Sequence, residues 1–236
     1  MIADRIRPHD VNIRSGPQMR EYVQIADRIA SERLSPILDW GCGLGQVSHL
    51  LLERGLEVES FDYRDGAELH VESLPEFPEV SAHLSGDPVA LPYPDAHFEA
   101  VLSCGVLEHV QHPEASLSEL HRVLRPGGRL LVYKLPNRFS YLELIARAAG
   151  LYYHGRWHYD RVYDRKLAVD LLTRSGFRVD AFRRTNMLPL SVTGAFAARN
   201  AERIWRANQW LSRVPVANLA ATNLELDATA LDGAPA

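Results

Sequence analysis

Three glycines that alternate with other residues constrain this chain more than any other feature of its sequence. They are Gly41, Gly43 and Gly45. The apolar pair before them, Ile37 and Leu38, is typical of a buried parallel strand, which ends at Asp39. The next segment, residues 44–54, carries apolar residues at helical spacing. Glycine lets the backbone pass close to a ligand, and a helix N-terminus offers free N–H groups to a polar one. The stretch therefore predicts a strand, a turn and a helix arranged as in a nucleotide-type binding site.

The composition is that of an ordinary soluble globular protein. Of the 236 residues, 46% are hydrophobic and 24% are charged, and the net charge of −4 gives no electrostatic reason to expect nucleic acid as a partner. The two cysteines, Cys42 and Cys104, fall at predicted strand ends, which favours a reducing compartment over a disulfide framework. Residues 1–14 lack the apolar segment of a secretion signal, and no apolar run reaches membrane-spanning length. We therefore expect a cytoplasmic α/β protein without a transmembrane segment.

Strand-like and helix-like segments alternate along most of the chain. The predicted strands are residues 37–38, 56–63, 80–84, 98–104, 129–134, 177–183 and 222–228, and the predicted helices are residues 19–33, 44–54, 113–124 and 165–175. Residues 67–77 are expected to form a weak helix or a loop. This alternation predicts a doubly wound, Rossmann-like α/β fold, in which helices cover both faces of a mostly parallel sheet. We expect an N-terminal arm over residues 1–18 and a single domain over residues 19–236, with insertions near 138–163 and 190–215.

Two acidic residues stand where predicted strands end. Asp62, with Tyr63 beside it, closes the second strand, where a parallel α/β fold places an acceptor for a ribose diol. The alternative is that Asp62 merely starts a turn. Asp87, followed by Pro88, either accepts a hydrogen bond from the exocyclic amine of an adenine or caps the next turn.

An ordered set of motifs extends beyond the glycine turn. Besides residues 37–46 it comprises Asp62, Gly86-Asp87, residues 98–109 and residues 119–130. This set resembles the class I S-adenosylmethionine-dependent methyltransferases, in particular the group of ubiquinone and menaquinone biosynthesis methyltransferases. The resemblance implies a seven-stranded sheet whose last strand is antiparallel, with S-adenosylmethionine as methyl donor and S-adenosylhomocysteine as product. The G-x-G-x-G spacing also differs from the G-x-G-x-x-G of dinucleotide enzymes, which argues against a nicotinamide-dependent reductase.

The resemblance also assigns the neighbours of the donor. It places Asp39 and Gly41 near the methionine portion, Asp62 near the ribose, Asp87 near the adenine, and the strand end at 103–104 below the sulfonium. The full predicted donor site is Asp39, Gly41, Cys42, Gly43, Gly45, Asp62, Tyr63, Asp87, Pro88, Ser103 and Cys104. A cationic sulfonium suits acidic residues and strand-end carbonyls rather than arginines. The cysteines are interpreted as small residues that permit close approach of the ligand rather than as a redox pair.

Candidates for the acceptor side lie in two places. Glu108-His109 follows the fourth strand, and we predict a catalytic role for His109; the alternative is that it closes a polar network at the start of a helix. Residues 152–160 form an aromatic cluster that supplies the second catalytic candidate, His158. The predicted acceptor pocket is Tyr153, His154, Trp157, Tyr159 and Tyr163, and the alternative is an ordinary exposed loop. Two histidines four residues apart can bind a metal on a helix, but Gly155 weakens that helix, so no metal site is predicted.

These features predict transfer of a methyl group to a small-molecule acceptor, with O-methylation favoured by analogy. The alternative is a catalytically silent S-adenosylmethionine-binding scaffold or regulator. Residues 195–213 depart from the minimal family pattern and carry arginines among aromatic side chains. They are read as a helix packed on the core, a cap over an apolar acceptor, the contact of a homodimer or a membrane-surface segment. No Asn-Pro-Pro-Tyr motif follows the fourth strand, so no nucleic-acid substrate is expected.

Overall fold

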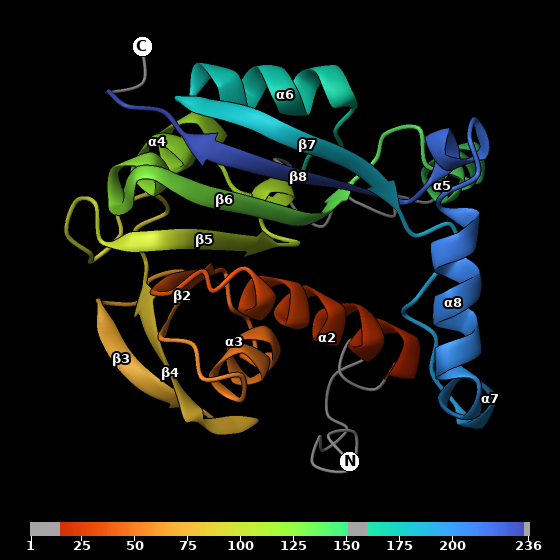
Figure 1. The fold of residues 1–236 in the computed structure, drawn as a ribbon, viewed down its shortest axis with the longest axis horizontal. Helices are drawn as coiled ribbons and strands as arrows, with labels where there is room; N and C mark the ends of the chain where they lie inside the picture. Colours follow the sequence, from red (N-terminus) through yellow and green to blue (C-terminus); the bar gives the residue numbers. More distant parts are fainter. Residues whose placement is uncertain (1–14, 151–159, 234–236) are drawn as a thin grey trace.

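The computed structural model describes residues 15–150 and 160–233, which form one mixed sheet with helices on both faces (Figure 1). The eight strands follow the order β3-β4-β2-β1-β5-β6-β8-β7. Their bounds are β1 (Ile37–Trp40), β2 (Val58–Tyr63), β3 (His70–Leu74), β4 (Phe77–Ser85), β5 (Phe98–Cys104), β6 (Leu124–Pro136), β7 (Phe177–Thr185) and β8 (Asn223–Ala230). The five strands from β4 to β6 in this order pair in parallel, whereas β3 pairs antiparallel with β4, and β8 antiparallel with both β6 and β7.

The helices cover the sheet because their apolar stripes match its two apolar faces. They are α2 (Gly16–Ser31), α3 (Gln46–Leu52), α4 (Pro113–Val123), α5 (Tyr141–Ala148), α6 (Arg165–Arg174), α7 (Ala195–Arg199) and α8 (Ala201–Leu211), with short 3₁₀ turns η2 (Leu107–His109) and η3 (Ala217–Ala220). One core cluster joins α2 and α3 to the sheet through residues such as Ile29 and Leu50. A second cluster joins α4 and α6 to the opposite face through residues such as Leu120 and Leu172. The doubly wound class predicted from the sequence is confirmed.

The order of the strands reverses between β1 and β5, which lie side by side with Trp40 opposite Ser103. In an open α/β sheet, ligands bind outside the carboxyl ends of the strands at such a switch point. The glycine turn follows β1 there, and Gly105 follows β5. Figure 1 shows β5 and β6 pointing toward α5 and α8, so these helices lie at the same edge of the sheet. The topology therefore places the predicted donor residues, α5 and α8 at one end of the molecule.

The sheet has one strand more than the seven predicted. Residues 67–77 were expected to be a weak helix or a loop, but β3 lies within them and forms an antiparallel hairpin with β4. That expectation was wrong because β3 is an edge strand with only Leu74 buried, so it lacks the apolar alternation that marks a strand in a sequence. The antiparallel β8 was placed correctly, since its apolar residues alternate on a buried sheet face.

The N-terminal helix begins earlier than its apolar stripe suggested. α2 starts at Gly16 rather than at residue 19, because the Ser15 hydroxyl caps it by accepting from the Gln18 N–H at 3.3 Å and Pro17 stands in its first turn. Residues 15–18, assigned to an arm in the prediction, therefore belong to the folded domain.

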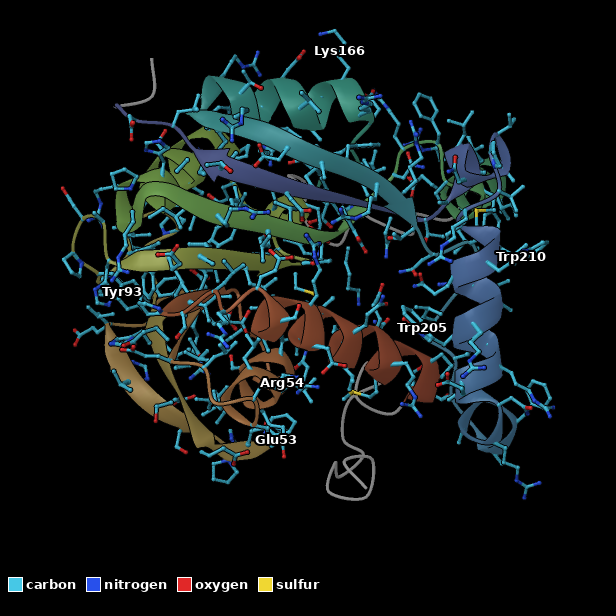
Figure 2. All side chains as sticks on the ribbon, viewed as in Figure 1. Glu53, Arg54, Tyr93, Lys166, Trp205 and Trp210 are labelled. Atoms are coloured by element: carbon cyan, nitrogen blue, oxygen red, sulfur yellow. The ribbon has the colours of Figure 1, made fainter. Side chains whose placement is uncertain are left out.

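The segment at 195–213 forms α7 and α8, and α8 packs against α2. Trp205 lies on the α2 side of α8, whereas Trp210 points away from the molecule (Figure 2). No helix within residues 15–150 and 160–233 is both long and apolar enough to cross a bilayer. Of the four interpretations of this segment, the packed helix is the one for which the structure shows contacts.

Candidate functional site

The glycine turn adopts a backbone that side chains disfavour. Gly41, Gly43 and Gly45 all have positive φ, at 76°, 55° and 84°. A Cβ on Gly41 would lie 2.4 Å from Val106 Cγ2, and one on Gly45 would lie 2.6 Å from Leu74 Cδ1. A Cβ on Gly43 would meet no atom within 4 Å. A side chain at Gly41 would clash with the branched Val106, one at Gly45 would displace the end of Leu74, and Gly43 faces open space.

Asp39 lies behind this turn, buried at 2% exposure. Its Oδ2 accepts a hydrogen bond of 2.6 Å from the Ser48 hydroxyl, which in turn accepts one of 2.8 Å from the Ser60 hydroxyl. The chain of polar groups joins β1, α3 and β2. Burial raises the pKa of Asp39 to about 6, opposed by the bond from Ser48. Asp39 thus stabilises the glycine turn through hydrogen bonds that join β1 to α3 and β2.

A first cavity of about 780 Å³ opens on the β2 side of the turn. It is lined by Trp40, Gly41, Phe61, Asp62, Tyr63, Arg64, Asp65, Pro88, Val89, Gly105, Val106, His109, Val110 and Gln111. The Tyr63 N–H donates to Asp62 Oδ1 at 3.1 Å, and burial raises the pKa of the Asp62 carboxyl. A carboxylate beside apolar walls suits a ligand that combines a hydroxyl-bearing ring with a flat apolar one.

Asp87 lies at the rim of this region rather than in its wall. Its Oδ1 accepts from the Val89 and Ala90 N–H groups, both at 2.8 Å, and these bonds lower the pKa of the carboxyl. This is the turn-capping role named above as the alternative. Pro88 and Val89, which follow Asp87 in this turn, line the first cavity, whereas Asp87 itself does not.

A second cavity of about 400 Å³ opens on the α2 side of the turn, and it is lined mostly by polar groups. Its lining includes Tyr22, Cys42, Gly43, Cys104, Glu108, Lys134 and Asn186. Gly41 and Gly105 line both cavities. The two spaces therefore meet at the ends of β1 and β5, where glycine leaves no side chain between them.

Lys134 brings a positive charge into the second cavity. Its φ is +60°, and the pairing of β6 with β8 shifts register between Val132 and Leu135, so the residue stands at a strained irregularity of the strand. Its Nζ donates to the Tyr22 hydroxyl at 3.1 Å. Within the described residues, no carboxylate lies within 4 Å of this nitrogen. The site therefore offers a half-buried cation to an anionic ligand.

Glu108 and His109 follow β5 in η2 and face different cavities. Glu108 is 5% exposed and lines the second cavity, while the half-exposed His109 lines the first. His109 Nδ1 lies 3.0 Å from the buried Asp160 carboxylate, and its Nε2 lies 3.8 Å from Glu108 Oε1. Burial raises the pKa of Glu108 to about 7. The Glu108 carboxyl group can therefore exchange a proton near neutral pH. It lies beside the point where the two cavities meet.

The structure brings together most of the predicted donor residues. Gly41, Asp62, Tyr63 and Pro88 line the first cavity, and Gly41, Cys42, Gly43 and Cys104 line the second. Burial raises the pKa of both thiols, which are free. Four predicted residues line neither cavity, namely Asp39, Gly45, Asp87 and Ser103. The first two support the glycine turn, Asp87 caps a turn, and Ser103 is buried within β5.

The predicted acceptor residues have a different outcome. Tyr153, His154, Trp157, His158 and Tyr159 lie outside the described residues. Tyr163 lines neither cavity, because its ring is buried in the core and its hydroxyl donates to the Leu107 carbonyl at 3.3 Å. It supports the η2 turn from beneath.

Three residues of the second cavity had no assigned role in the sequence analysis. Lys134 follows the run Leu130–Tyr133 in the predicted strand 129–134, and a charge after such a run was the available signal. Tyr22 was read only as part of an apolar helical stripe, although its hydroxyl reaches Lys134. Glu108 was named with His109 as an acceptor-side candidate, but the catalytic role was assigned to His109 alone.

Known proteins match the region that contains this site. Residues 38–132 match the sequence model of the family described as "Methyltransferase domain". A probable S-adenosylmethionine-dependent methyltransferase of Mycolicibacterium smegmatis is 34% identical over 120 residues, which cover 51% of this chain and 44% of that protein. A demethylmenaquinone methyltransferase of Beutenbergia cavernae is 38% identical over 96 residues, covering 41% of this chain and 39% of that protein. The chain spans about half the length of the curated relatives it matches.

Solved structures share the fold over a larger part of the chain. An S-adenosylmethionine-dependent methyltransferase from Archaeoglobus fulgidus superposes with a TM-score of 0.56 at 16% identity, over 88% of this chain and 94% of that one. A 1,6-didemethyltoxoflavin-N1-methyltransferase from Burkholderia thailandensis, solved with S-adenosylhomocysteine, gives a TM-score of 0.53 at 20% identity, over 91% and 78%. At these identities the likeness shows the fold alone. Residues 38–132 therefore match a methyltransferase domain, and relatives that match the same region are named S-adenosylmethionine-dependent methyltransferases.

Proposed function

We propose that this protein transfers a methyl group from S-adenosylmethionine to a hydroxyl of a small-molecule acceptor. The observation that carries the proposal is the meeting of the two cavities at Gly41 and Gly105, at the switch point of the sheet. A donor with a nucleoside at one end and an amino acid at the other requires two such compartments with an open passage between them. When bound, the donor supplies a methyl group already activated by a positively charged sulfur.

The residues present fit this donor. In the first cavity Asp62 offers carboxylate oxygens to the ribose diol, and Phe61, Pro88 and Val89 offer an apolar wall to the adenine. In the second cavity Gly43 leaves open space beside the turn. Lys134, which lines the same cavity, is the cation that we assign to the carboxylate of the methionine portion.

The preference for oxygen rests on Glu108. A hydroxyl acceptor must lose its proton as the new bond to carbon forms, whereas an amine can enter neutral. The buried Glu108 carboxyl group, with a pKa of about 7, suits the removal of a proton from a hydroxyl acceptor. Names of relatives do not separate the two cases, since a 35% identical protein of Serratia marcescens is a malonyl-[acyl-carrier protein] O-methyltransferase and the Burkholderia enzyme is an N-methyltransferase.

The test is turnover of the full chain with a panel of acceptors, in which S-adenosylhomocysteine release and product mass are measured. The proposal expects a product heavier by one methyl group with a phenol or another hydroxyl compound. Methylation of amines only would refute the preference for oxygen. Donor binding without any product across hydroxyl, amine, thiol and carbon acceptors would favour the silent scaffold. The homodimer contact, one of the four interpretations of residues 195–213, is checked in parallel by the mass in solution from light scattering.

A further inference from the structure

A buried carboxyl group with an unpartnered oxygen lies where the two cavities meet. Glu108 Oε2 has no hydrogen-bond partner among the described residues, although it is shielded from solvent. Its other oxygen, Oε1, would lie 3.8 Å from a Cβ built on Gly105, the glycine that lines both cavities. Leaving such a group unpaired costs stability, so its position calls for a ligand or for chemistry.

The neighbours of Glu108 form a path toward solvent. His109 Nε2 lies 3.8 Å from Glu108 Oε1, a separation that a small rotation converts into a hydrogen bond. The opposite ring nitrogen, Nδ1, lies 3.0 Å from Asp160 Oδ1, which holds the ring in place. The His109 side chain is 46% exposed, so the path runs from the second cavity to solvent.

Building on the proposed function, we propose that Glu108 accepts the proton of the acceptor hydroxyl and that His109 relays this proton to solvent. As the acceptor oxygen bonds to the methyl carbon, the carbon–sulfur bond breaks and its electron pair stays on sulfur, which becomes neutral. The hydroxyl proton moves to Glu108 Oε2. The carboxyl group then rotates so that its protonated oxygen faces His109, and Nε2 of that ring accepts the proton. Asp160 stabilises the resulting His109 imidazolium. The exposed edge of the His109 ring then releases the proton to solvent.

The charges around Glu108 are consistent with this role. Burial raises the pKa of Glu108 to about 7, and His109 and Lys134 oppose that rise while Asp160 adds to it. The titratable groups that face it are His109, Asp160, Lys134, Cys104 and Tyr163. Above neutral pH the carboxylate form is available as a base, and below it the group is already protonated. The relay is therefore expected to favour turnover above pH 7.

The first test needs no acceptor. It compares S-adenosylhomocysteine with sinefungin, which carries an ammonium group in place of the sulfonium methyl. In the wild type, the preference for sinefungin should rise roughly tenfold between pH 6 and pH 8 as Glu108 ionises. In Glu108→Gln this rise should vanish, while the affinity for S-adenosylhomocysteine stays within about twofold of wild type. In His109→Gln the midpoint of the rise should move to higher pH, because this variant lacks an interaction that lowers the pKa of Glu108.

The second test uses turnover on the acceptor panel described above. Glu108→Gln should lower turnover by about a hundredfold without weakening S-adenosylhomocysteine binding, as for loss of a general base. Glu114→Gln, which removes an exposed carboxylate of α4, is the matched control and should match wild type in both tests. Unfolding by urea checks that each variant is folded.

The outcomes separate two failures. If the wild type binds neither compound, the proposed function itself is wrong. If it binds both, and Glu108→Gln keeps the pH-dependent preference for sinefungin, the proton relay is wrong while the proposed function stands. The binding comparison decides even where no compound of the panel turns over.

Discussion

At the scale of single residues, two glycines allow folding to be separated from ligand binding. Gly43 and Gly55 both have positive φ, at 55° and 76°, and neither would place a Cβ within 4 Å of another atom. Alanine at either position should therefore cost a similar 1–2 kcal/mol or so of folding free energy. Only Gly43 lines the second cavity. We expect Gly43→Ala to weaken S-adenosylhomocysteine binding at least about tenfold and Gly55→Ala to leave it unchanged, as measured by calorimetry. Equal affinities in the two variants would show that the turn does not contact the donor.

Asp39 supplies a prediction about pH and stability. Its pKa rises from 3.8 to about 6 on folding, so the folded protein holds this proton more tightly than the unfolded chain does. The free energy of unfolding therefore falls as the pH rises from about 4 to about 6, and the loss is complete above pH 6. Asparagine cannot ionise, yet its Oδ1 can still accept from Ser48.

We therefore expect Asp39→Asn to gain unfolding free energy relative to wild type by roughly 1–3 kcal/mol between pH 4 and pH 8. Urea unfolding at several pH values measures this difference. Asp65→Asn, at an exposed position, is the control. A difference between Asp39→Asn and wild type that stays constant with pH would show that Asp39 is not desolvated as described.

Lysine is rare in this chain, which makes the charge at position 134 easy to isolate. The two lysines are Lys134, in the second cavity, and Lys166, exposed on α6 (Figure 2). Lys134→Met should weaken S-adenosylhomocysteine binding about tenfold or more, because a bond to a charged group contributes about 1.5–3 kcal/mol. Binding of 5′-methylthioadenosine, which lacks the amino acid, should not change. Lys166→Met should bind both compounds as wild type does. An equal loss for both compounds in Lys134→Met would assign the effect to misfolding of the cavity.

At the scale of elements, α8 is joined to the cavity wall through buried amides. Asn208 is fully buried; its Nδ2 donates to Asn186 Oδ1 at 2.8 Å, and its Oδ1 accepts from the Leu188 N–H at 2.9 Å. Asn208→Ala leaves both partners unpaired and should cost about 2–3 kcal/mol of unfolding free energy. Gln209→Ala, one residue along the helix, removes only a 3.4 Å contact with Gln24 and should cost less than about 0.5 kcal/mol. Equal costs would mean that α8 is not anchored there.

The elements that could be predicted from the sequence are those with a buried apolar pattern. β5 was placed at its observed bounds because a parallel strand covered on both faces is apolar throughout. β3 was missed because an exposed edge strand needs no such pattern. The start of α2 was misjudged for a related reason, since its first turn is set by the Ser15 cap and not by apolar spacing.

At the scale of the whole molecule, the donor side of the site was more predictable than the acceptor side. The carboxyl ends of β1, β2 and β5 meet at one edge, so Gly41, Asp62 and Cys104 converge once the strand order is known. Topology does not fix which side chains turn inward. Asp39 points behind the turn, and Lys134 enters the cavity only because β6 is irregular there. Glu108 depends on how η2 leaves β5, which no periodic pattern records.

The central claim is that the two cavities form one site for S-adenosylmethionine. The most direct measurement is calorimetric titration of the full chain with S-adenosylhomocysteine and, separately, with NAD⁺. We expect one-to-one binding of S-adenosylhomocysteine with a dissociation constant well below about 1 mM, the value that corresponds to roughly −4 kcal/mol, and no binding of NAD⁺. Binding of NAD⁺ in preference to S-adenosylhomocysteine, or no heat with either compound, would contradict the claim.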